Sequence, residues 1–164
     1  MCERPVPSFS KTIPMVQRTP ASLATLYERD ETAWLEQTAE LVRAGRFAEC
    51  DLLNLAEYLD SMAQRERREV FSRLIVLLTH LLKWEYQPDR RSGSWRGTIR
   101  EQRRELRGLL ESGTLLNQAI SVFADAYVEA RLQAADETEL NLDIFPVQNP
   151  WELETALNGA DPAM

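Results

Sequence analysis

"RERREVFSRLIVLLTHLLKWEY", residues 65–86, is the stretch that decides the fold. Its apolar residues cover well over half of the circumference of a helix. Such a helix is buried on several sides, which predicts that it lies at the centre of the structure. Pro88 ends it, because proline has no backbone N–H to donate and clashes with the preceding turn.

On the N-terminal side, the helical pattern continues without Gly or Pro back to Asp51, which is a suitable N-cap. One helix from Asp51 to Tyr86 would be long for a compact domain. We therefore predict a bend near Ser61–Gln64, with a single continuous helix as the alternative. Further upstream, Asp30 is placed to cap a helix that Gly45 ends.

Three more helical segments are expected after Pro88. Ser94 is a candidate cap for a helix with Trp95 and Ile99 on its apolar stripe. "NPWE", residues 149–152, predicts a last helix with Asn149 as its cap. Between them, apolar residues recur at helical spacing and predict the buried face of another helix: Leu116, Ile120, Phe123, Tyr127, Ala130 and Ala134.

No window shows sustained period-two alternation, so the chain is predicted to be all-α. With 164 residues, it is expected to form a compact single-domain bundle of about five or six helices around the central apolar helix. The predicted all-helical domain covers residues 21–158. Residues 1–20 are predicted to be a disordered or extended leader, and residues 159–164 a flexible C-terminal tail.

The composition suggests a cytoplasmic protein. The apolar content of 44% and charged content of 27% are ordinary globular values. No apolar run approaches the roughly 20 residues needed to span a bilayer, so no membrane association is predicted. Cys2 and Cys50 make no disulfide framework, which favours a reducing compartment.

The stretch "HLLKWEYQPDRRSGSWRGTIREQRR", residues 80–104, resembles the signature of a bacterial family, domain-of-unknown-function family 29. Further segments fit that family in the same order: "YERDETAW" (27–34), "AGRFAECDLLNLAEYL" (44–59), "REVFSRLIVLL" (68–78) and "FPVQNPW" (145–151). The resemblance covers roughly residues 23–158. It implies an all-helical single domain and brings no established activity, substrate or cofactor.

The basic residues gather in the middle of an acidic chain. The net charge is −7, yet residues 61–110 hold 12 basic and 6 acidic side chains, and 17 of the 19 basic residues are Arg. Arg96, Arg100, Arg103 and Arg107 fall on one helical stripe, suited to bidentate pairing with carboxylates or phosphates. Pairing with acidic residues of the same chain is the alternative. Overall acidity argues against a dedicated DNA-binding protein, although nucleic acid is not excluded.

The other candidate residues lie at the same corner. His80, the only histidine, could form a pocket with Lys83, Gln102 and Arg103, although a structural role in the core is the alternative. Trp84, with Trp95, could offer a stacking face to a single strand. No catalytic residue is assigned. No metal site is assigned, because no second His and no ligand spacing accompanies His80, and no cofactor is expected.

The sequence alone leaves the function unknown. Charge segregation without a catalytic constellation favours a non-enzymatic interaction or regulatory module that binds a protein partner or itself as a homo-oligomer. The alternative is an anionic-ligand or nucleic-acid binding protein, or an uncharacterised enzyme, with its site at the His80/Arg103 corner.

Overall fold

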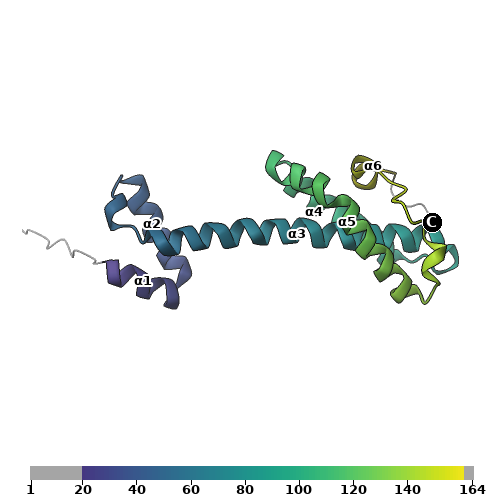
Figure 1. Ribbon diagram of the computed structural model, residues 1–164, viewed down its shortest axis with the longest axis horizontal. Helices are drawn as coiled ribbons and strands as arrows, with labels where there is room; N and C mark the ends of the chain where they lie inside the picture. Colours follow the sequence, from purple (N-terminus) through teal and green to yellow (C-terminus); the bar gives the residue numbers. More distant parts are fainter. Residues whose placement is uncertain (1–19, 161–164) are drawn as a thin grey trace, which may run out of the picture. The chain divides into compact units, whose positions relative to one another are not determined.

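The computed structural model describes residues 20–160, and their side chains from Leu23 onward. The all-α class is confirmed: within this part of the chain there are six α-helices and no strand (Figure 1). The α-helices are α1 (Pro20–Arg29), α2 (Glu31–Arg43), α3 (Leu52–Tyr86), α4 (Gly93–Leu110), α5 (Gly113–Thr138) and α6 (Leu153–Asn158). Three 3-10 helices connect them: η1 (Phe47–Glu49), η2 (Pro88–Arg90) and η3 (Leu142–Ile144).

The contacts divide the chain between Leu59 and Asp60 into two compact units. The single domain over residues 21–158 stays a prediction. The predicted leader, residues 1–20, lies outside the described residues except for Pro20, where α1 begins. The predicted tail, residues 159–164, also lies outside them except for Gly159 and Ala160.

The first unit is built around Trp34, which is fully buried on α2. Its ring lies between those of Tyr27 and Tyr58, with centroid distances of 4.7 Å and 5.7 Å. The predicted boundaries of α2 are confirmed. The Asp30 side chain accepts a hydrogen bond from the backbone of Ala33 at 2.9 Å, and Gly45 follows the C-cap with a φ of 69°. Glycine suits this position because it adopts positive φ without steric cost.

Helix α3 is continuous, so the predicted bend near Ser61–Gln64 is wrong. Asp51 caps the helix as expected, accepting a hydrogen bond from the backbone of Asn54 at 3.3 Å. The helix then runs for 35 residues, and every side chain from Leu59 to Arg68 is exposed. The bend was expected because a single helix of this length is unusual in a compact domain. Nothing in this stretch breaks a helix, because it consists of good helix formers without Gly or Pro.

The second unit packs α4 and α5 against the C-terminal half of α3 (Figure 1). From Val70 onward, α3 turns most of its apolar side chains inward, which confirms it as the central apolar helix. Small side chains of α5, such as Ala126 and Ala130, meet this core and allow a close approach. The hydroxyl of Thr79 donates to the carbonyl of Ala130 at 3.4 Å, so the buried polar group of α3 is satisfied.

Two predicted caps are displaced. Ser92, not Ser94, caps α4: it has extended backbone, and its side chain accepts a hydrogen bond from the backbone of Trp95 at 3.3 Å. Asn149 does not cap α6, which begins at Leu153. Its side chain instead accepts from the backbone of Trp151 at 3.0 Å and forms a turn before the helix. The α4 start offers two serines, and the first of them caps the helix, whereas the N-cap of α6 is Glu152, which makes no side-chain capping bond.

Among residues 20–160, no helix combines the length and the apolar content needed to cross a membrane.

The continuity of α3 can be tested at Ala63, an exposed position inside the stretch where a bend was expected. Ala63→Gly should destabilise the chain by about 1 kcal/mol, and Ala63→Pro by about 3 kcal/mol or more. Urea unfolding followed by circular dichroism measures both effects. A loop at this position would tolerate both substitutions, so an unchanged unfolding midpoint for Ala63→Pro would contradict a continuous helix.

Candidate functional site

The eight residues singled out from the sequence lie on two helices of the second unit. His80, Lys83 and Trp84 belong to the last turns of α3. The remaining five belong to α4: Arg96, Arg100, Gln102, Arg103 and Arg107. Two hollows are lined by members of this set. One includes Arg100, Arg103 and Arg107, the other Trp84 and Arg103, and neither includes His80, Lys83 or Gln102.

His80 is half-buried, and its Nδ1 lies 2.9 Å from the carbonyl oxygen of Val76 on the preceding turn. Burial holds the pKa of His80 below its ordinary value, and the charge of Lys83 acts in the same direction. The bond to Val76 and the carboxylate of Glu137 oppose this shift. The imidazole is therefore neutral near pH 7, and the surroundings favour a histidine that belongs to the packing of α3.

Lys83 is 7% exposed, which is unusual for a lysine. Its ammonium group donates to the carboxylate of Glu137 on α5 and lies 4.6 Å from the ring centroid of Trp95 on α4. Burial raises the pKa of the Glu137 carboxyl, but hydrogen bonds from Lys83 and Gln133 outweigh it and hold that pKa below its ordinary value. Lys83 thus joins three helices through one charge.

The two tryptophans of this corner have cations over their rings. The guanidinium carbon of Arg91 lies 5.1 Å from the ring centroid of Trp84, and Arg91 also donates to the carbonyl of Trp84 at 2.8 Å. The ammonium group of Lys83 lies over the ring of Trp95. A base that stacks on either ring would have to displace a cation, so these rings are not open stacking platforms.

Arg103 is the buried member of the arginine stripe, with 5% of its surface exposed. Its Nε donates to the carbonyl of Ala156 at 2.9 Å, and its Nη1 donates to those of Gly159 and Ala160 at 2.8 Å and 3.2 Å. These carbonyls belong to the last turn of α6 and the residues after it. Arg103 therefore binds the C-terminal end of α6, where the helix dipole favours a cation.

Gly159 is required by this contact. A Cβ atom there would lie 2.7 Å from the carbonyl oxygen of Thr155 and 3.1 Å from Nη2 of Arg103. The first distance is shorter than real Cβ contacts, and the backbone oxygen cannot move away. Any larger residue would push the chain away from the guanidinium group.

Of the other arginines of α4, all but the half-buried Arg96 are exposed. Within residues 20–160, the guanidinium groups of Arg96 and Arg107 make no hydrogen bond or ion pair. Arg104 pairs only with the adjacent Glu105, at 2.7 Å. Gln102 accepts a hydrogen bond from Arg73 on α3 at 3.3 Å, so it links two helices.

A hollow with a volume of about 430 Å³ lies between α4 and α6, and we call it the arginine hollow. It is lined by Gly97, Arg100, Glu101, Arg103, Arg104, Arg107, Leu157 and Gly159. Four of these residues are arginines and one is an acid, in a chain whose net charge is −7. Arg103 binds the carbonyl of Gly159, another of the lining residues. The hollow is therefore a cationic recess in an acidic protein.

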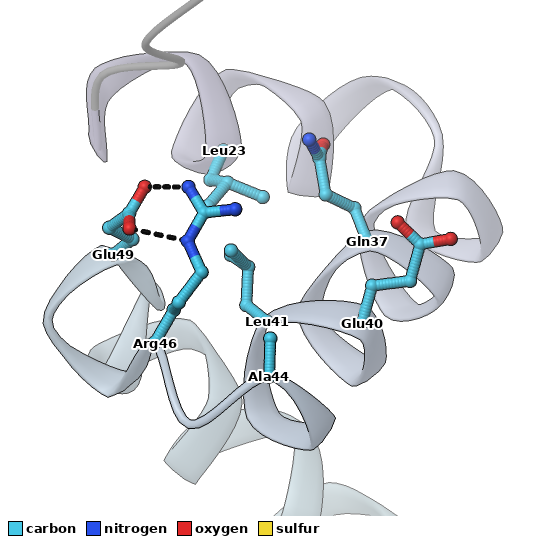
Figure 2. Close-up of a pocket in the computed structure, with 7 residues that line it drawn as sticks. All are labelled: Leu23, Gln37, Glu40, Leu41, Ala44, Arg46 and Glu49. Atoms are coloured by element: carbon cyan, nitrogen blue, oxygen red, sulfur yellow. Dashed lines mark hydrogen bonds and ion pairs between the residues drawn. The ribbon is translucent and has the colours of Figure 1, made fainter. Parts of the chain in front are cut away.

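A second hollow, of about 320 Å³, lies in the first unit and was not expected from the sequence (Figure 2). Gln37 and Glu40 of α2 line one side, Arg46 and Glu49 the other, with Leu23 and Leu41 between them. The Nε of Arg46 donates to Glu49 at 2.6 Å and its Nη2 to the second carboxylate oxygen. Since both charges already satisfy each other, this hollow is less suited to a charged ligand than the arginine hollow.

Sequence reasoning missed several residues that organise this unit. Arg104 lines the arginine hollow but lies outside the predicted stripe. Arg131 of α5 donates to the carbonyls of Phe145 and Leu142, at 3.0 Å and 2.9 Å, and so fixes the chain after α5. Glu137 is the acidic partner of Lys83 and was not singled out from the sequence. Partners more than 50 residues apart, such as Lys83 and Glu137, leave no local signal in one sequence.

No group of three or more His, Cys, Asp or Glu side chains that could hold a metal ion is found in residues 20–160.

Replacing Arg103 tests its role at the end of α6. Arg103→Ala should lower the free energy of unfolding by about 2–4 kcal/mol, because one buried and two partly buried carbonyl groups lose their donor. Amide hydrogen exchange should rise most in residues 153–158. Arg104→Ala, at an exposed position, should cost less than about 0.5 kcal/mol. Unchanged protection of residues 153–158 in Arg103→Ala would show that α6 is held by other contacts.

The lowered pKa of His80 predicts a pH dependence of stability. The unfolded chain binds a proton near pH 6.5 and the folded chain only at lower pH, so stability should fall as pH drops below about 6.5. His80→Gln should flatten the stability profile between pH 7 and pH 5.5, measured by urea unfolding at each pH. A wild-type profile that rises on acidification would mean that Glu137 stabilises a protonated His80.

Comparison with known proteins identifies one family. The family described as Domain of unknown function DUF29 matches residues 26–160, most of the chain. This match confirms the resemblance carried by residues 80–104. No curated protein and no solved structure matches the chain.

Proposed function

We propose that the chain, which belongs to the DUF29 family, is a binding module that takes an acidic segment of a partner protein into the arginine hollow. The observation that carries this proposal is the cationic recess itself. Exposed guanidinium groups line it, and one of them, that of Arg107, makes no ion pair within residues 20–160.

The spacing of these arginines suits an extended acidic peptide. Arg100, Arg104 and Arg107 lie at i, i+4 and i+7 on α4, so they span about 10 Å along the helix axis. Side chains on one face of an extended chain recur about every 7 Å. Two carboxylates at alternate positions of a strand-like segment can therefore each reach a guanidinium group. Arginine suits this role because its planar fork binds a carboxylate through two parallel hydrogen bonds.

Two observations favour a carboxylate ligand over nucleic acid. A polyphosphate carries a charge on every nucleotide, so the net charge of −7 repels it at long range more strongly than a short segment with two carboxylates. In addition, cations already lie over the rings of Trp84 and Trp95, so stacking would add little to the binding of a single strand.

A labelled peptide tests this function. The probe is a twelve-residue peptide of alternating Glu and Ser, and binding is followed by fluorescence anisotropy at low salt. The double variant Arg104→Glu/Arg107→Glu should bind it at least about tenfold more weakly, since each lost pair contributes up to about 1 kcal/mol. Arg67→Glu/Arg90→Glu is the matched control, because it changes two other exposed arginines by the same total charge.

The outcomes separate the alternatives. The proposal predicts that the control variant retains binding and that the affinity falls as salt is raised. Equal losses in both double variants would show that only net charge matters, and the proposal would be wrong. Tighter binding of a single-stranded oligonucleotide than of the peptide, lost in the same variant, would assign the recess to nucleic acid instead.

A further inference from the structure

Helix α5 carries an apolar row on its outer face. Leu116 and Ile120, which the sequence placed in the core, are 38% and 60% exposed. Val128 and Leu132 continue the row at 56% and 46%, and the exposed Ala124 lies between them at the same spacing of four residues. The prediction that Leu116 and Ile120 face the core is therefore wrong.

The core contact of α5 includes the predicted Tyr127, Ala130 and Ala134, whose burial is confirmed. Leu115, Ala119, Ala126, Ala130 and Ala134 are buried against the cluster formed with α3 and α4. The helix is thus apolar on two faces, and residues 20–160 cover only one of them. Helices that are apolar all round are typically covered on both sides.

A hollow of about 480 Å³ opens where this row begins, between α5 and α6. Leu116 and Ile120 form one wall, and Leu153 and Leu157 of α6 form the other. Leu157 also lines the arginine hollow, so α6 separates a cationic recess from an apolar one.

The rim of the apolar face is acidic. Exposed Asp125, Glu129 and Asp136 flank the row on α5, and exposed Glu152 and Glu154 flank the hollow on α6. Residues 111–164 contain ten acidic residues and one basic residue, Arg131. The guanidinium group of Arg131 is bound to the carbonyls of Leu142 and Phe145.

We propose that this face of α5 and α6 binds an amphipathic helix of another protein, with apolar residues on one side and Lys or Arg beside them. The apolar row would receive the apolar stripe, and the acidic rim would pair with the basic flanks. A second copy of α5 fits less well, because it would bring Asp125 and Glu129 against their own copies.

The geometry defines the length of the partner. The row from Leu116 to Leu132 covers 17 residues, about 24 Å along the axis. Residues four apart form a ridge, and a second helix that presents ridges of residues three apart packs against it at about 20°, which keeps the two helices in contact along the row. A partner helix of four to five turns covers this row and places its end over the hollow between α5 and α6. This site is independent of the proposed function, which rests on α4.

Two synthetic peptides of 18 residues test the proposal. Both carry the same leucine stripe, and the remaining positions are Lys in one and Glu in the other. We expect the Leu/Lys peptide to bind at least tenfold more tightly than the Leu/Glu peptide, as measured by fluorescence anisotropy. Ile120→Asp/Val128→Asp should weaken its binding at least thirtyfold. Leu53→Asp/Val147→Asp, two highly exposed apolar positions outside α5 and α6, is the matched control and should bind like the wild type.

Charge reversal gives a second readout that packing alone would not produce. Glu129→Lys/Glu154→Lys should weaken the Leu/Lys peptide and strengthen the Leu/Glu peptide, each about tenfold. Arg104→Glu/Arg107→Glu should not weaken Leu/Lys binding, so failure of this site and failure of the arginine hollow are distinguishable.

Three results would overturn the proposal. The first is equal binding of the two peptides. The second is a dimer in sedimentation experiments that Ile120→Asp converts to a monomer, since a second copy would then cover the face. The third is a clear loss of thermal stability in Ile120→Asp without any partner, since the face would then be covered within the chain.

Discussion

The binding of Arg103 to the end of α6 is the contact on which the surface of the second unit depends. A buried guanidinium group needs several acceptors, and here three carbonyl oxygens provide them. Helix α6 has only six residues and could not hold its position by local hydrogen bonds. Once it is fixed, its residue Leu157 becomes a wall shared by a cationic recess and an apolar one. One interior side chain therefore shapes two exposed surfaces.

The same unit uses its cations in two ways, which explains why a stripe of arginines was difficult to interpret. Lys83, Arg91 and Arg103 are bound to rings, carbonyls or a carboxylate and serve the fold. Arg104 and Arg107 remain at the surface. Pairing with carboxylates of the same chain, the alternative considered for the whole stripe, describes Arg104, which pairs with Glu105. Arg103 donates to backbone oxygens at the end of α6.

The sequence predicted the fold class, the central helix and the caps at Asp30 and Asp51, because periodicity and capping are local properties. The burial of Arg103 also had a local signal. Arg103 shares the phase of Ile99, Leu106 and Leu110, the three buried apolar residues of α4, as well as that of the arginine stripe. No local signal in the sequence distinguished the exposed apolar face of α5 from its buried face. A helix with apolar residues at every phase does not reveal which side meets the core, and its tertiary contacts decided that alanines face inward.

The uninterrupted course of α3 also has a consequence for proteolysis. The boundary between the two compact units falls inside a helix, so no loop joins them. Trypsin-like proteases cleave extended backbone, and the exposed Arg65, Arg67 and Arg68 lie in helical turns whose hydrogen bonds must first open. The three peptide bonds after these arginines are accessible to solvent, but their helical conformation protects them from cleavage. The rate at which the chain is cut there therefore reports on the local unwinding of α3, and not on the accessibility of a linker.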